Sequence, residues 1–93
     1  MNQASITPPK VLIYCTKFCP YCMRAHMLLK NKGIEYETIN VGGDENLWEE
    51  MESKSGRNTV PQIFIDDYHV GGYDDLVAHN RSGQLDKLLE ITE

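Results

Sequence analysis

Two cysteines separated by two residues form the part of this sequence best suited to chemistry: Cys19-Pro20-Tyr21-Cys22. A cysteine pair at this spacing, beside a strand–helix–strand pattern, is typical of a redox-active dithiol. The nucleophile in disulfide exchange is a thiolate, whereas a free cysteine thiol, with a pKa of about 8.5, is mostly protonated at neutral pH. One of the two cysteines therefore needs surroundings that favour its ionised sulfur.

The start of a helix would supply those surroundings. Pro20 stands at the expected first helical position, where proline is favoured. As the residue before it, Cys19 would face unpaired backbone N–H groups and the positive end of the helix dipole, and Lys17 adds a nearby positive charge. Cys22 would lie one turn further along the same face and be more buried. The spacing thus predicts that Cys19 attacks and Cys22 resolves.

A metal site is the alternative interpretation of the cysteines. Cys15, Cys19, Cys22 and His26 together have the residue types and a spacing that could provide four zinc ligands. Against this, Cys15 belongs to an apolar run that predicts a strand, and Pro20 suits the start of a helix better than a metal-binding knuckle. A chain of this length can also form a core without a metal. We therefore expect no metal, and Cys15 is interpreted as a small buried hydrophobic residue.

Hydrophobic patterning predicts the elements that hold these residues. Strands are expected over residues 11–15, 34–41, 61–65 and 68–70, the last two joined as a hairpin. Helices are expected from residue 20 to the stop at Gly33, from a cap at Asp44 to Gly56, and after a cap at Asp74 or Asp75, with a break at Gly83. The order β-α-β-α-β-β-α predicts a two-layer α/β domain with a mixed four-stranded sheet, because a strand–helix–strand unit pairs its strands in parallel.

Length and composition limit the function classes. The 93 residues, 41% hydrophobic and 25% charged, correspond to one small soluble domain. No apolar run approaches the roughly 18–20 residues of a membrane span, and no signal peptide is visible. Three cysteines without such a signal favour a reducing, cytoplasmic location. The net charge of −5 argues against a nucleic-acid partner.

The cysteine motif and three further features together make the chain resemble a dithiol glutaredoxin of the thioredoxin superfamily. These features are Lys17, the segment Thr59-Val60-Pro61, and the segment Gly71-Gly72-Tyr73-Asp74-Asp75. The resemblance extends from about Lys10 to Leu89. It implies a thioredoxin-like fold, with residues 1–9 as a flexible arm and residues 10–93 as the glutaredoxin domain. The tetrapeptide Cys-Pro-Tyr-Cys differs from the thioredoxin pattern Cys-Gly-Pro-Cys and from the monothiol pattern Cys-Gly-Phe-Ser.

The resemblance also implies a glutathione site. A cis peptide bond at Pro61 would expose the Val60 backbone to pair with glutathione as an added strand. The backbone N–H groups of Tyr73 and Asp74 would bind the γ-glutamyl carboxylate. The implied glutathione-binding residues are Lys17, Tyr21, Arg57, Thr59, Val60, Pro61, Gly72, Tyr73, Asp74 and Asp75.

Several of these assignments have alternatives. Asp74 is favoured for the glutathione ammonium, because Asp75 could instead cap the helix. Lys17 and Arg57 are implied to meet the glycine carboxylate, although a base near a helix end, such as Arg57, is favourable in itself. Thr59 is alternatively a residue that only positions the turn.

The implied function is a monomeric, glutathione-dependent thiol–disulfide oxidoreductase. It would reduce protein–glutathione mixed disulfides and protein disulfides through Cys19 and Cys22, with glutathione as the reductant. Two alternatives belong to other classes: an iron–sulfur module in which Cys19 and glutathione ligate a cluster in a dimer, and a non-catalytic interaction domain that keeps only the fold.

Charge is unevenly distributed along the chain. Residues 1–34 hold all three cysteines and five basic residues without an acid, whereas all 14 acids follow from Glu35 onward. One interpretation is the ordinary solvation of helix surfaces. The other is a basic neighbourhood that stabilises the Cys19 thiolate and attracts anionic glutathione.

Overall fold

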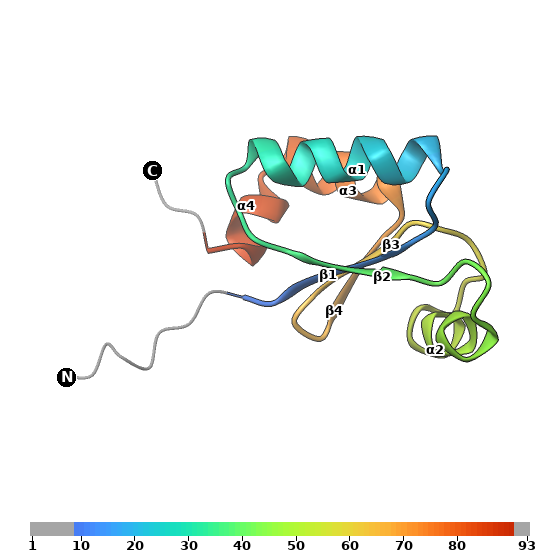
Figure 1. The fold of residues 1–93 in the computed structure, drawn as a ribbon. Coiled ribbons are helices and arrows are strands. Elements are labelled where there is room, and N and C mark those ends of the chain that lie inside the picture. The colour runs from blue at the N-terminus through green and yellow to red at the C-terminus, as the bar shows by residue number, and fades with distance from the viewer. Residues whose placement is uncertain (1–8, 91–93) are drawn as a thin grey trace.

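The strands form one mixed four-stranded sheet in the order β2-β1-β3-β4 (Figure 1). The structure is a computed structural model that describes residues 9–90. Strand β1 (Val11–Cys15) pairs in parallel with β2 (Glu37–Asn40) and antiparallel with β3 (Gln62–Ile65), which pairs antiparallel with β4 (Tyr68–Gly71). The predicted parallel pair and antiparallel hairpin are therefore confirmed.

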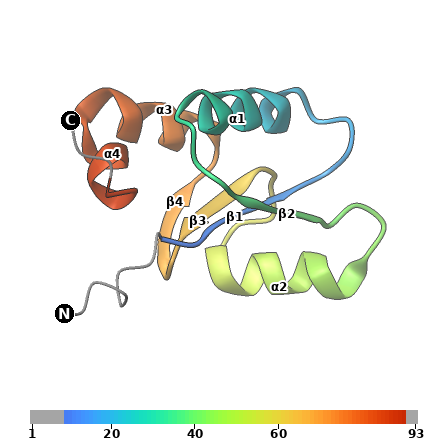
Figure 2. The same ribbon diagram turned by 60° about the vertical axis from the view of Figure 1, so that its left-hand side comes forward.

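Helices cover both faces of the sheet. Helices α1 (Pro20–Asn31), α3 (Tyr73–Ser82) and α4 (Gln84–Leu88) lie on one face, and α2 (Glu45–Ser55) lies on the other (Figure 2). The expectation of two layers is wrong, because the molecule has three. The apolar run of β1 explains the third layer, since successive side chains of a strand point to opposite faces and both must be covered.

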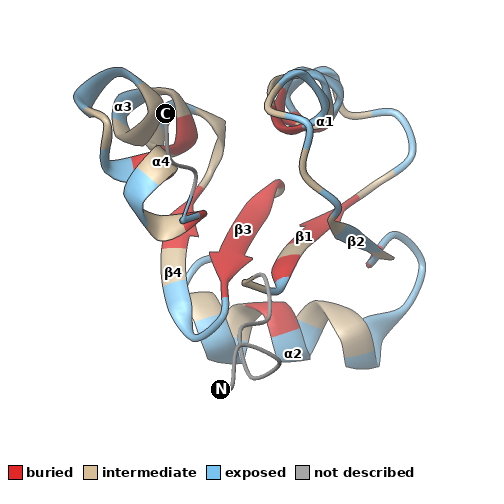
Figure 3. Cartoon of the chain, turned by 90° about the vertical axis from the view of Figure 1, so that its left-hand side faces the viewer, coloured by how far each residue is buried: buried red, intermediate tan, exposed pale blue. Residues whose placement is uncertain are grey.

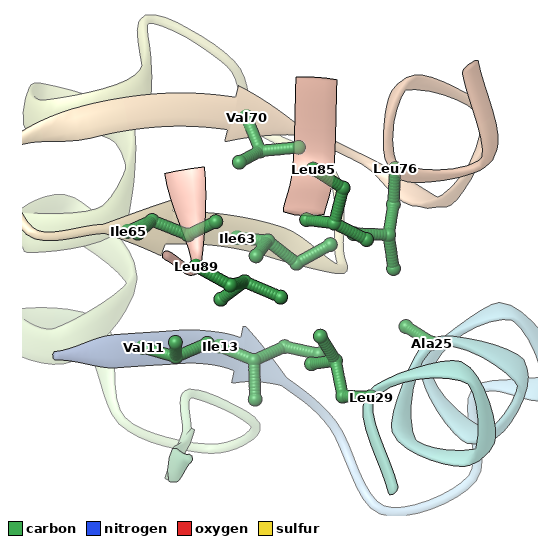
Figure 4. Packing of buried hydrophobic residues seen from close by; sticks show 10 residues of the cluster. All are labelled: Val11, Ile13, Ala25, Leu29, Ile63, Ile65, Val70, Leu76, Leu85 and Leu89. Atoms are coloured by element: carbon green, nitrogen blue, oxygen red, sulfur yellow. The ribbon is translucent and has the colours of Figure 1, made fainter. Parts of the chain in front are cut away.

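Each face of the sheet has its own hydrophobic cluster. On the first face, Ile13 of β1 and Ile63 of β3 pack against Leu29 of α1, Leu76 of α3 and Leu85 of α4 (Figure 4). On the second face, the buried residues Tyr14, Val41, Met51 and Phe64 pack together, with Trp48 of α2 partly buried against them. Figure 3 shows the buried positions gathered on the central strands β1 and β3. The sheet is therefore a rigid support for the loops at its ends.

Element boundaries differ most from the sequence prediction at two places, and by one residue at the start of β3 and the end of β4. The second strand was expected over 34–41 but pairs only over Glu37–Asn40, while Ile34 and Tyr36 pack against the first core cluster before the pairing begins. Helix α3 begins at Tyr73 with Gly72 as its N-cap, not at Asp74 or Asp75.

The predicted break at Gly83 is present, where a φ of 85° separates α3 from α4. The predicted arm, residues 1–9, lies outside the described residues except for Pro9, as do residues 91–93. Within residues 9–90, no helix combines the length and the apolar character needed to cross a bilayer.

Candidate active site

Cys19 is the N-cap residue of α1. Its backbone is extended (φ −100°, ψ 115°), and Pro20 begins the helix. The Cys19 sulfur accepts a hydrogen bond from the backbone N–H of Cys22 at 3.4 Å. The first turn of α1 contains no acidic residue. The half-buried sulfur therefore lies at the positive end of the helix dipole, as the position of Pro20 predicts.

Cys22 lies in a different environment one turn further along the helix. Only 1% of its surface is exposed. Burial raises the pKa of the Cys22 thiol well above its ordinary value, and a hydrogen bond from the Thr16 backbone only partly opposes this. All three cysteines are free thiols. At neutral pH, Cys22 is therefore protonated and shielded, whereas the sulfur of Cys19 is accessible to a substrate.

The loop before β3 brings backbone groups next to Cys19. The Val60–Pro61 peptide bond is cis, as the family resemblance implies. The Val60 carbonyl oxygen lies 4.0 Å from the Cys19 sulfur. Gln62, which is fully buried, holds this loop: its amide nitrogen donates to the Thr59 carbonyl at 3.0 Å and to the Thr59 hydroxyl at 3.2 Å.

Gln62 is a positioning residue that the sequence prediction missed. Its side-chain oxygen also lies 2.7 Å from Nε2 of His69. The available signal was a polar residue inside an otherwise apolar strand, because a buried polar group needs hydrogen-bond partners.

The turn between β4 and α3 forms the far side of the site. Gly71 has a φ of 117°, and a Cβ placed there would collide with the carboxylate of Asp75. That carboxylate accepts a hydrogen bond from the Gly72 N–H at 2.9 Å and one from the Arg57 guanidinium at 2.8 Å. These two hydrogen bonds, the one from Arg57 foremost, hold the pKa of Asp75 below its ordinary value. Asp75, the third residue of α3, thus accepts a hydrogen bond from the N–H of the N-cap residue Gly72 and pairs with Arg57, while Asp74 is exposed.

Nine of the ten predicted glutathione-binding residues line one hollow. It has a volume of about 290 Å³ and is bordered by Tyr21, Arg57, Thr59, Val60, Pro61, Gly72, Tyr73, Asp74 and Asp75. The rings of Tyr21 and Tyr73 face each other across it, with centroids 6.2 Å apart, and the Arg24 guanidinium lies 5.6 Å from the centre of the Tyr21 ring. Larger hollows exist elsewhere, but this one combines the cis proline loop with the N-terminus of α3. We refer to it as the binding pocket.

Lys17 does not line the binding pocket. It borders a separate hollow of about 190 Å³, together with Cys15, Cys22 and His26. Two other basic residues of the acid-free segment are engaged in ion pairs: Lys10 with Glu37 at 3.7 Å and Lys32 with Asp86 at 2.6 Å. Among the basic residues of that segment, only Arg24 lies against an aromatic ring of the pocket lining.

Two of the candidate zinc ligands, Cys15 and His26, contact each other, and His26 also contacts Tyr36. The Cys15 sulfur lies 3.6 Å from Nε2 of His26, and Nδ1 of His26 lies 3.0 Å from the Tyr36 hydroxyl. Within residues 9–90, no three His, Cys, Asp or Glu side chains are arranged to hold a metal ion. The sequence pattern could not predict the contact between His26 and Cys15, because the two residues lie on different elements, α1 and β1, that meet only in the folded protein.

Comparison with known proteins gives one consistent result. The sequence model of the glutaredoxin family matches residues 11–70. The chain is 51% identical over 81 residues to a glutaredoxin of Pseudomonas aeruginosa, covering 87% of this chain and 96% of the relative. It is 50% identical over 80 residues to glutaredoxin 3 of Escherichia coli, covering 86% of this chain and 96% of the relative.

Solved structures agree with the sequence relatives. The solution structure of a glutaredoxin from Brucella melitensis matches with a TM-score of 0.80 at 48% identity, covering 91% of this chain and 92% of that one. A buckwheat glutaredoxin, crystallised as its glutathione complex, matches with a TM-score of 0.80 at 27% identity, covering 88% of this chain and 77% of that one. With its cysteine pair at the start of α1 beside the cis proline loop, this chain belongs to the glutaredoxin family of glutathione-dependent disulfide oxidoreductases.

Proposed function

We propose that this protein reduces protein–glutathione mixed disulfides and protein disulfides, using Cys19 and Cys22 as a dithiol and glutathione as the reductant. The observation that carries the proposal is the position of the half-buried Cys19 sulfur, 4.0 Å from the Val60 carbonyl at the edge of the binding pocket. The buckwheat relative, whose structure is a glutathione complex, supports the choice of ligand.

In the first reaction, the Cys19 thiolate attacks the glutathione sulfur of a mixed disulfide. The bond between that sulfur and the protein sulfur breaks, and the substrate protein leaves as a thiolate that takes up a proton. Glutathione then remains joined to Cys19. A second glutathione attacks this disulfide, releases oxidised glutathione and restores the Cys19 thiolate.

In the second reaction, Cys19 attacks a protein disulfide and forms a mixed disulfide with the substrate. Cys22 then attacks the Cys19 sulfur, which releases the second substrate thiol and leaves a Cys19–Cys22 disulfide. Two glutathione molecules reduce that disulfide. The two reactions therefore differ in whether Cys22 takes part.

The groups of the binding pocket match the charges of glutathione. The Val60 backbone would pair with the cysteinyl backbone of glutathione. The N–H groups of Tyr73 and Asp74 at the start of α3 would bind the γ-glutamyl carboxylate. Asp74 would bind the ammonium, since the carboxylate of Asp75 is already bound by Arg57 and Gly72.

The glycine carboxylate of glutathione would meet Arg57. The ion pair with Asp75 uses Nη1 of Arg57 and leaves further guanidinium N–H groups free to donate. Lys17, which was expected to share this role, borders the other hollow, and its contact with the glycine carboxylate stays a prediction. Tyr21 would line the groove beside the mixed disulfide, with Thr59 supporting the Val60 loop.

We further propose that the protein acts as a monomer in the cytoplasm. Three free thiols, two of them in a redox motif, suit a compartment in which glutathione keeps cysteines reduced.

The test is reduction of a small glutathione mixed disulfide, coupled to NADPH oxidation through glutathione reductase. We expect the wild-type protein to be active, Cys19→Ser to be inactive, and Cys22→Ser to keep this activity but lose the reduction of protein disulfides. An active Cys19→Ser protein, or a wild-type protein that glutathione cannot reduce, would contradict the proposal.

A further inference from the structure

The resolving cysteine has a proton that must leave a buried position. This inference rests on the proposed dithiol reaction, in which Cys22 attacks the Cys19 sulfur. Cys22 is 1% exposed, and burial raises the pKa of its thiol. A thiol at such a site reacts slowly unless a neighbouring group accepts its proton as the sulfur attacks.

The neighbour of Cys22 on the side away from the binding pocket is Cys15, the last residue of β1. A hydrogen bond from Cys22 lowers the pKa of the Cys15 thiol, although burial, the stronger effect, raises it. Cys15 is 4% exposed, and its sulfur lies 3.6 Å from Nε2 of His26 on α1. All three side chains border one hollow of about 190 Å³, so Cys22, Cys15 and His26 form a series in which Cys15 stands next to both of the others.

The series continues from His26 toward the surface. Nδ1 of His26 lies 3.0 Å from the Tyr36 hydroxyl, and the two rings are stacked with centroids 5.4 Å apart. His26 and Tyr36 are both partly exposed and border a hollow of about 410 Å³. The series thus begins at the buried Cys22 sulfur and ends at groups that water can reach.

The protonation state of His26 fits the transfer of a proton from Cys15 to the imidazole. Burial, and to a smaller extent the charge of Lys30, lowers the pKa of His26, so its ring is neutral at neutral pH. The tautomer that carries hydrogen on Nδ1 donates to the Tyr36 hydroxyl and leaves Nε2 free to accept from Cys15. Three titratable groups surround the His26 ring: Cys15 of β1, Tyr36 ahead of β2 and Lys30 of α1. Lys17 borders the hollow that His26 shares with Cys15 and Cys22.

We propose that Cys15 and His26 form a proton relay that activates Cys22 for its attack on the mixed disulfide. As the Cys22 sulfur bonds to the Cys19 sulfur, the bond from Cys19 to the substrate sulfur breaks, and the substrate leaves as a thiolate. The Cys22 proton passes to the Cys15 sulfur while the Cys15 proton passes to Nε2 of His26. The imidazolium then returns its proton to water, and the departing thiolate takes one up.

In this relay Cys15 is not oxidised at any step. Cys15 and His26 act through Cys22 and touch no substrate atom, so they are positioning residues. Two other roles for the same contacts make different predictions. A structural role, in which the network only joins α1 to β1, would alter every activity together. A redox role for Cys15, in which it forms a disulfide, would require its sulfur.

The experiment separates the two cysteine reactions without using glutathione. The reduced protein is mixed with one equivalent of dithiobis(nitrobenzoate) in a stopped-flow instrument. Attack by Cys19 releases the first coloured thiolate and leaves a mixed disulfide, and attack by Cys22 then releases the second. The Cys22→Ser protein identifies the phases, because it should show the first release only.

We expect His26→Gln, whose side chain can still accept a hydrogen bond from Cys15 but cannot take up its proton, to slow the second phase about ten-fold or more. General bases typically contribute about 10²–10⁴-fold. Cys15→Ala should slow the second phase similarly, whereas Cys15→Ser should largely retain it, because a hydroxyl both donates and accepts. The first phase should stay within about two-fold of wild type in all three proteins.

The pH profile provides a second readout. In the wild-type protein, the second-phase rate should fall as the pH drops through the pKa of His26, which lies below the ordinary value of about 6.5. That step should be absent in His26→Gln, in which the rate should follow only the ionisation of Cys22.

Three results would overturn the relay: an unchanged second phase in His26→Gln, equal slowing of both phases, or a Cys15→Ser protein as slow as Cys15→Ala. Loss of the second phase in the wild-type protein would instead contradict the proposed dithiol reaction.

Discussion

The two sides of the cysteine pair differ in whether water or the protein itself provides the hydrogen-bond partners of their polar groups. On the binding-pocket side, Arg57, Thr59 and Asp74 stand on loops or at the start of a helix and are exposed to solvent. On the opposite side, which we call the relay side, Cys22 and Cys15 are buried and their polar contacts are within the protein. Among the described residues, no buried side-chain nitrogen or oxygen lacks a hydrogen-bond partner.

This contrast separates residues whose replacement should affect ligand binding from residues whose replacement should affect stability. An exposed polar residue on a loop contributes little to folding, because water satisfies it in both states. A buried polar residue affects folding more strongly, because its replacement leaves a buried partner without a hydrogen bond. Asp75 is the exception on the binding-pocket side, since its carboxylate both caps α3 and pairs with Arg57.

Thiol labelling should show the largest difference between the two sides. We expect iodoacetamide to modify only Cys19 in the native reduced protein, because Cys15 is 4% exposed and Cys22 is 1% exposed. All three cysteines should react in denaturant. Mass spectrometry of the labelled protein, with Cys19→Ser as the control, measures the stoichiometry. Rapid native labelling of Cys22 would remove the distinction between the sides.

Gly71→Ala should produce the next largest effect, a loss of about 2 kcal/mol in the free energy of unfolding. The expected cost combines a φ of 117°, which disfavours any side chain, with displacement of the Asp75 carboxylate. Gly72→Ala is the matched control, since its new Cβ would lie 3.4 Å from the Pro61 carbonyl oxygen, a tight contact without a positive φ. Urea denaturation of both proteins measures the difference, and equal losses would refute the argument from Asp75.

Asp75→Ala should have a smaller effect, a loss of about 1 kcal/mol, typical of a helix cap. Hydrogen bonds from Arg57 and Gly72 lower the pKa of Asp75, so its stabilisation is present above the unfolded value of about 3.9. It is lost as the pH falls through the lower folded value. Urea denaturation between pH 2 and pH 6 should show wild type and Asp75→Ala converging at the acid end. A difference that stays constant would contradict the role of the carboxylate charge.

Asp74→Asn should have the smallest effect, confined to substrate binding. We expect a KM for a glutathione mixed disulfide several-fold above that of wild type and an unchanged urea midpoint, because exposed Asp74 would meet only the ligand ammonium. The control is Asp67→Asn, an exposed acid in the turn between β3 and β4, which should leave KM unchanged. Equal KM values for the two variants would remove Asp74 from the proposed site.

Much of the site was predictable because its signals are local. The position of Pro20 after Cys19 predicts the N-cap, and Gly71-Gly72 marks the start of α3 within one or two residues. The family resemblance added the cis bond before Pro61, which the structure contains. The ion pair of Arg57 with Asp75 was not predictable, because 18 positions separate its partners along the chain.

Predictions that depended on which face a residue occupies were less successful. Two layers were expected, although the apolar run of β1 already required cover on both faces, and α2 provides the third layer. Lys17 is close to Cys19 along the chain and borders the hollow on the relay side, and its contact with glutathione stays a prediction. Residues that are close in the sequence are also close in space, but their side chains can point to opposite sides of a strand or helix.

The amino-acid sequence was enough to predict the reacting cysteines and to identify the family, because the cysteine pair, the proline segment and the double-glycine segment are all local signals. The contacts behind the cysteine pair depend on tertiary packing. In the sequence, Cys15 and His26 stand out only as candidate zinc ligands, one in an apolar strand and the other on a helix. They meet because β1 and α1 pack together, and burial at that contact sets the protonation states of both.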